Sequence, residues 1–93
     1  MRIFKFIVPV QDSYVVVAMP AGATILSVQN QGGQPALWAL VDETARKEPR
    51  TFMWKGTGHD CDELADPLHP WKYRATVQFS GGALVFHLFE KVL

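Results

Sequence analysis

The sequence has little cysteine, no net charge and no long apolar run. Its one cysteine, Cys61, cannot form an intrachain disulfide, so nothing indicates an oxidising compartment. Nine basic residues balance nine acidic ones, whereas proteins that bind double-stranded nucleic acid usually carry a basic excess for phosphate contacts. No apolar run approaches the roughly 20 residues of a membrane-spanning helix. We therefore expect a cytoplasmic protein with no membrane partner and no nucleic-acid partner.

Apolar residues are abundant, at 48% of the chain, with three Trp and six Phe. A chain of this length forms one domain, residues 1–93, and buries about 60–65% of the surface that its unfolded form exposes. The apolar content exceeds what one small core needs, so we expect a second copy of the chain to cover part of the surface. Zero net charge makes such homo-oligomers easier to form.

The clearest structural pattern is a C-terminal hairpin. From Trp71 to Phe79 apolar and polar residues alternate, which predicts a strand with one buried face. Gly81 and Gly82 follow, and two glycines supply the positive φ angles of a two-residue turn. Such a turn predicts that these residues lie opposite each other or side by side: Val77 with Phe86, Ala75 with Leu88, Thr76 with His87, and Arg74 beside Phe89.

The chain as a whole is predicted to be mainly β. Helical periodicity is scarce, and β-branched and aromatic residues dominate the apolar segments. Residues 42–49 are predicted to form a charged loop or one helical turn that ends at Pro49. Residues 56–70 form the longest irregular segment, with at most one short helical turn near residues 60–66. We expect a small antiparallel β-sandwich or barrel of six to seven strands built from hairpins, over residues 2–10, 13–19, 23–30, 36–42, 50–55, 71–79 and 83–91.

One glycine-rich loop carries most of the residues suited to ligand binding. Gly56 and Gly58 allow a ligand close to the backbone, and Lys55, Thr57 and His59 add side-chain donors. This composition suits a small phosphate-bearing ligand, although the spacing is that of neither a P-loop nor a Rossmann loop. The alternative is a plain turn in which His59 caps a backbone group. The candidate ligand-binding residues are Lys55, Gly56, Thr57, Gly58, His59 and Arg74.

Catalysis and metal binding have less support. His59, Cys61 and His69 are residue types that bind zinc, but their spacing matches no zinc pattern. A Cys–His nucleophile pair would need a contact that the sequence does not indicate. We assign no metal, no cofactor and no catalytic residue. Arg74 beside Phe89 is a weak version of a single-strand nucleic-acid site, and ordinary packing of the two side chains is the alternative.

Several segments resemble a family of short, uncharacterised proteins from tailed bacteriophages and prophages. They are Met19–Gln29, Leu37–Asp42, Gly56–His59 and Gly81–His87, and they occur in the same order over nearly the whole chain. The resemblance implies a phage-encoded protein that acts in a bacterial cytoplasm. It implies no activity and no functional residue.

The sequence favours binding over catalysis. We expect an accessory phage protein that counters a host defence, by sequestering a nucleotide signal or by blocking a host protein. One alternative is a structural protein of virion assembly. The other is a small metal-assisted hydrolase that uses His59, Asp60 or Cys61.

Overall fold

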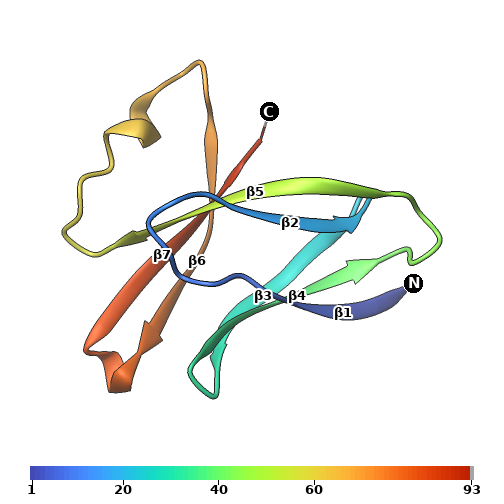
Figure 1. Ribbon diagram of the computed structural model, residues 1–93, viewed down its shortest axis with the longest axis horizontal. Coiled ribbons are helices and arrows are strands. Elements are labelled where there is room, and N and C mark those ends of the chain that lie inside the picture. Colours follow the sequence, from blue (N-terminus) through green and yellow to red (C-terminus); the bar gives the residue numbers. More distant parts are fainter. Residues whose placement is uncertain (93) are drawn as a thin grey trace.

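The computed structural model describes residues 1–92 as two facing antiparallel sheets (Figure 1). The predicted mainly β fold of up to seven strands, with one short helical turn near residues 60–66, is confirmed. The two helical segments, η1 and η2, are single 3₁₀ turns, and neither is long or apolar enough to cross a membrane. The elements are β1 (Arg2–Ile7), β2 (Val15–Pro20), β3 (Thr24–Gln31), β4 (Gln34–Val41), β5 (Lys47–Gly56), η1 (Asp62–Ala65), β6 (Trp71–Phe79), η2 (Ser80–Gly82) and β7 (Leu84–Lys91).

The strands divide unevenly between the two sheets. One sheet has the order β1-β4-β3 and the other the order β2-β5-β7-β6. Because β1 and β2 belong to different sheets, residues 8–14 cross from one layer to the other. The sheets also meet at the edges formed by β3 and β6, where Asn30 Nδ2 donates a hydrogen bond to the Gln78 carbonyl oxygen (3.1 Å). This contact joins one side of the sandwich.

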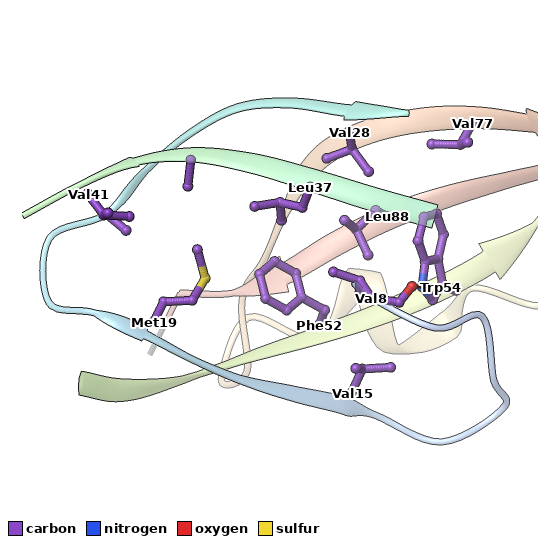
Figure 2. Close-up of a cluster of buried hydrophobic side chains, with 12 residues drawn as sticks. Val8, Val15, Met19, Val28, Leu37, Val41, Phe52, Trp54, Val77 and Leu88 are labelled. Atoms are coloured by element: carbon purple, nitrogen blue, oxygen red, sulfur yellow. Dashed lines mark hydrogen bonds between the residues drawn. The ribbon is translucent and has the colours of Figure 1, made fainter. Parts of the chain in front are cut away.

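The core fills the space between the sheets (Figure 2). Alternate side chains of each strand point inward, since successive residues of a strand face opposite sides. The indole of Trp54 is buried, and its Nε1–H donates to the Val8 carbonyl oxygen (3.1 Å), which satisfies the polar atom and anchors the crossing segment. The buried cluster consists of Val8, Val15, Met19, Ala23, Val28, Leu37, Ala39, Val41, Phe52, Trp54, Val77 and Leu88.

The predicted register of the last hairpin is confirmed near its turn. Val77 lies opposite Phe86, Ala75 opposite Leu88 and Thr76 opposite His87. Gly81 and Gly82 have φ angles of 66° and 95°, as expected, and the Ala83 N–H donates to the Ser80 carbonyl oxygen (3.2 Å). Ser80 also has a positive φ of 52°, so the connection is longer than the predicted two residues and includes Ser80 and Ala83 between β6 and β7.

Further from the turn, a β-bulge changes the pairing. Tyr73 lies opposite Phe89 while Ala75 lies opposite Leu88, so Arg74 is the extra residue on β6. The prediction that Arg74 lies beside Phe89 is therefore wrong. The bulge directs the Arg74 guanidinium to the buried carboxylate of Glu90, and the ring that packs on Phe89 is that of Tyr73.

The charged segment 42–49 is shorter than predicted. Its turn is built on Asp42, whose carboxylate accepts hydrogen bonds from the N–H and the hydroxyl of Thr44. Strand β5 already begins at Lys47, so the prediction of a loop or helical turn up to Pro49 is wrong. Pro49 is tolerated because β5 pairs there with Ala18 of β2 alone, and pairing with β7 starts only at Phe52.

An ion triad closes one end of the core. Glu90 is 5% exposed, and its two carboxylate oxygens accept hydrogen bonds from Arg50 Nε (2.5 Å) and Arg74 Nη2 (2.6 Å). Arg50 Nη1 also donates to the Ala23 carbonyl oxygen (2.6 Å). The triad therefore links β5, β6, β7 and the start of β3. Burial alone raises the pKa of Glu90, but the hydrogen bonds and charges of both arginines outweigh it and hold the pKa below its ordinary value.

We predict that the triad makes stability depend on acid pH. Because the pKa of Glu90 is lower in the folded than in the unfolded state, the stabilisation is complete above the unfolded-state value, about 4.3 for Glu. It is lost as pH falls through the folded-state pKa. Glu90→Gln should cost roughly 3–5 kcal/mol at neutral pH, because two partly buried arginines lose their buried counter-charge, and should flatten the acid dependence. Urea unfolding at about pH 3, below the ordinary pKa of a Glu carboxyl, and at about pH 7, above it, measures both effects.

The matched control is Glu43→Gln, which breaks the exposed Arg2–Glu43 ion pair. An exposed pair contributes about 0–1 kcal/mol. Equal losses of stability in the two variants would contradict a special role for Glu90.

Candidate functional site

An apolar cleft opens at one end of the sandwich. The tips of the β3–β4 and β6–β7 hairpins lie at this end (Figure 1), and the cleft between them has a volume of about 520 Å³. This volume lies in the range of small-molecule sites. Phe79 and Phe86 pack edge to face within its lining, with ring centroids 6.1 Å apart. The cleft is lined by Ile7, Pro9, Val10, Gly33, Gln34, Pro35, Phe79, Ser80, Leu84 and Phe86.

A smaller and more polar pocket adjoins the cleft. Its volume is about 310 Å³, and Gly56, Thr57 and His59 contribute to its lining. Leu84 and Phe86 line both hollows, so the two hollows are neighbours at the start of β7. One is mainly apolar and the other is more polar.

Glycine-rich backbone shapes the polar pocket. The Thr57 N–H donates to the Val85 carbonyl oxygen (3.1 Å) and the His59 N–H to the Gly56 carbonyl oxygen (3.0 Å). Gly58 has a φ angle of 86°, which favours glycine. The imidazole of His59 lies against Gly56, where a Cβ atom would come within 2.7 Å of its Cε1. Glycine at position 56 therefore allows the ring to approach the end of β5 closely.

A chain of hydrogen bonds connects Thr57 to side chains on the outer face of the larger sheet. The Thr57 hydroxyl lies 2.8 Å from His87 Nε2 and 3.5 Å from the Val85 carbonyl oxygen. The contact with His87 is the shorter one, and His87 Nδ1 forms a second hydrogen bond with the Thr76 hydroxyl (2.9 Å), which in turn contacts the Tyr73 hydroxyl (2.7 Å). In the neutral imidazole one ring nitrogen donates and the other accepts. The interpretation of His87 as a satisfied sheet histidine is confirmed, and its link to the candidate loop was not foreseen.

The predicted ligand residues divide into separate groups. Gly56, Thr57 and His59 line the polar pocket, and Gly58 lies in the same loop. Lys55 faces a different hollow, which Asp12, Ser13, Tyr14, Met53 and Glu63 also line.

Both predicted cations are paired with carboxylates. Lys55 Nζ forms an ion pair with Glu63 of η1, and Arg74 pairs with Glu90. The sequence predicts neither pairing, because the irregular segment between Lys55 and Glu63 has no regular geometry and the bulge at Arg74 changes the register of its hairpin. The polar pocket therefore offers hydroxyl, imidazole and backbone groups, and these two positive charges are already compensated elsewhere.

The residues considered for zinc have other contacts. His69 Nδ1 lies 2.9 Å from the Asp66 carboxylate, and the Cys61 thiol donates to the His59 backbone carbonyl (3.3 Å). Within residues 1–92, no three His, Cys, Asp or Glu side chains are grouped closely enough to hold a metal ion.

We predict that Gly56→Ala displaces the His59 ring with little effect on stability. The added Cβ requires the imidazole to move, but His59 is an exposed side chain that can rotate away. The free energy of unfolding should change by less than about 1 kcal/mol, while the imidazole NMR signals of His59 shift. The control is Gly56→Ala combined with His59→Ala, whose stability should match that of His59→Ala alone, because the three atoms nearest to the added Cβ all belong to the His59 ring. Unchanged His59 signals in Gly56→Ala would contradict the close contact between the ring and Gly56.

The comparison with protein families places the whole chain in one family. A family model described as a domain of unknown function, DUF7352, matches residues 1–93. No curated protein matches the chain, and no solved structure matches it. The family description names neither a source nor an activity. The chain belongs to the DUF7352 family.

Proposed function

We propose that the protein binds a small amphipathic ligand of the nucleoside or nucleotide class without transforming it. The observation that carries the proposal is that the apolar cleft and the polar pocket are neighbours that share Leu84 and Phe86 as lining residues. Ligand sites of soluble proteins are mostly apolar hollows with a few convergent polar groups. A planar ring would occupy the cleft, and its polar substituents would reach Thr57 and His59.

In this proposal the planar ring of the ligand contributes more to the binding free energy than a phosphate group does. Phe79 and Phe86 offer aromatic surface to a flat heteroaromatic group, and stacking of a base on an aromatic side chain is worth about 1–3 kcal/mol. A phosphate would need unpaired cations nearby, yet Lys55 and Arg74 are paired with Glu63 and Glu90. The ligand is therefore recognised by its ring and its hydroxyl or amino groups.

We propose further that the protein is phage-encoded and acts in a bacterial cytoplasm, where it withholds a nucleotide signal from a host defence. This part is supported by the collinear segments that resemble tailed-phage proteins, among them Gly56–His59 and Gly81–His87. Both segments border the polar pocket, so the resemblance and the proposed site coincide in the same part of the fold.

Calorimetric titration tests the proposal. The probes are the four common ribonucleosides and their 5′-monophosphates. We expect at least one base to bind, and its nucleoside and monophosphate to differ by less than about tenfold in Kd, which corresponds to about 1.4 kcal/mol. No heat of binding with any of the eight compounds at roughly millimolar concentration would contradict the proposal.

Substitutions locate the site. Leu84→Gln should weaken binding by about tenfold, because it puts an amide into the apolar lining shared by both hollows. Leu68→Gln is the matched control, since Leu68 is exposed and lines neither hollow. His59→Ala should weaken binding and Lys55→Ala should leave it unchanged. Equal affinity in Leu84→Gln and Leu68→Gln would place any observed binding elsewhere.

A further inference from the structure

Both ring nitrogens of His87 lie within hydrogen-bond distance of a hydroxyl group. Nε2 lies 2.8 Å from the Thr57 hydroxyl, and Nδ1 lies 2.9 Å from the Thr76 hydroxyl. The Thr76 hydroxyl continues the chain to the hydroxyl of Tyr73 (2.7 Å), which is an exposed residue. Thr57 lines the polar pocket. The chain of side chains therefore connects the surface of the larger sheet with the candidate ligand site.

The protonation state of His87 decides in which direction these hydrogen bonds run. In a neutral imidazole one ring nitrogen donates and the other accepts, whereas in an imidazolium both donate. On protonation, the hydroxyls of Thr57 and Thr76 must therefore both accept. Thr76 then donates to the Tyr73 hydroxyl, and Thr57 is left to donate to the Val85 carbonyl oxygen (3.5 Å) or to a ligand. Each N–H of the imidazolium has an acceptor, and such hydrogen bonds favour the charged form.

The positive charge next to His87 is compensated. Lys55 of β5 lies opposite His87, so the two side chains share the outer face of the sheet. The Lys55 ammonium pairs with Glu63 of η1, and the hydrogen bond to Glu63 raises the pKa of Lys55. Lys55 therefore opposes a second positive charge at His87 only in part. The titratable groups on the elements around His87 are Lys55 of β5, Tyr73 of β6, Lys91 of β7, and His59, Asp60, Cys61 and Glu63 of the segment after β5.

We propose that His87 is a proton switch for the polar pocket, an inference that rests on the ligand site proposed above. Imidazole side chains change their charge between about pH 5 and pH 8. At the upper end of this range Thr57 offers the pocket a hydroxyl beside a neutral ring. At the lower end the same hydroxyl accepts from an imidazolium 2.8 Å away. Acidification thus supplies the cation that Lys55 and Arg74 do not provide, because both are paired with carboxylates, and it favours a ligand with a negative group.

An NMR titration of the ligand-free chain from about pH 5 to about pH 8 tests the switch. We expect the Thr57 methyl signal to move with the imidazole signals of His87 at a common midpoint. This movement should be lost in His87→Gln, because an amide side chain does not change its charge. The competing source of such a shift is His59, which lines the same pocket. The movement should persist in His59→Gln, and a Thr57 signal that follows the midpoint of His59 instead would overturn the proposal.

Thr76→Val gives a second measurement that leaves His87 in place. The variant removes the acceptor at Nδ1, so the His87 midpoint should move to lower pH by about half a unit or more. Thr51→Val is the matched control, because Thr51 lies opposite Val16 of β2 and β5 pairs with β7 only from Phe52 onward. It should leave the midpoint unchanged. Equal midpoints in Thr76→Val and the wild type would also overturn the proposal.

Calorimetric titration separates the switch from the proposed function. The probes are each ribonucleoside and its 3′,5′-cyclic monophosphate, whose phosphodiester keeps one negative charge over this pH range. The affinity for the cyclic compound relative to the nucleoside should rise roughly two- to fivefold from pH 8 to pH 5.5, and less in His87→Gln, as expected of one added charge near solvent. A ratio that does not change with pH would contradict the switch. No binding of any probe at either pH would contradict the proposed function, while the NMR titration would still decide whether His87 controls Thr57.

Discussion

The register between β6 and β7 decides which side chains enter the space between the two sheets. The Gly81-Gly82 turn sets Val77 against Phe86 and Ala75 against Leu88. The alternation of strand side chains then directs this set toward the core and leaves Thr76 and His87 on the outer face. A slip of one residue would exchange the two faces. The cleft, the buried end of β7 and the polar contacts of the outer face all depend on this one register.

The bulge at Arg74 is the second feature on which the arrangement of side chains depends. With one extra residue on β6, the guanidinium reaches Glu90, and the carboxylate bridges two arginines. Lys55 is paired in the same way with Glu63. Both cations that the sequence analysis assigned to an anionic ligand are therefore paired within the chain. The chemistry open to a ligand at the glycine-rich loop is therefore that of an apolar cleft with hydroxyl and imidazole groups beside it. Electrostatic attraction has a smaller part, because those charges are already paired.

The two sheets contribute unequally to the surface of the protein. The larger sheet binds the glycine-rich loop through the contacts of Thr57 to Val85 and His87. The smaller sheet has a regular β1 edge and exposed isoleucines on its outer side. The apolar side chains that the fold leaves in contact with water include Ile7, Val10 and Leu84 at the cleft, and also Ile3 on β1 and Val16 on β2.

The sequence by itself determined the strands, the tight C-terminal turn and the pairs nearest to it, because alternation and glycine chemistry act over a few neighbouring residues. It also placed Gly56, Thr57 and His59 in one loop. Only the tertiary structure decided where the bulge falls, that β5 continues through Pro49, and that Glu63 and Glu90 neutralise Lys55 and Arg74. These outcomes depend on contacts between strands and on the path of the irregular loop between Lys55 and Glu63. Local patterns cannot specify such contacts, because packing between the two sheets selects them.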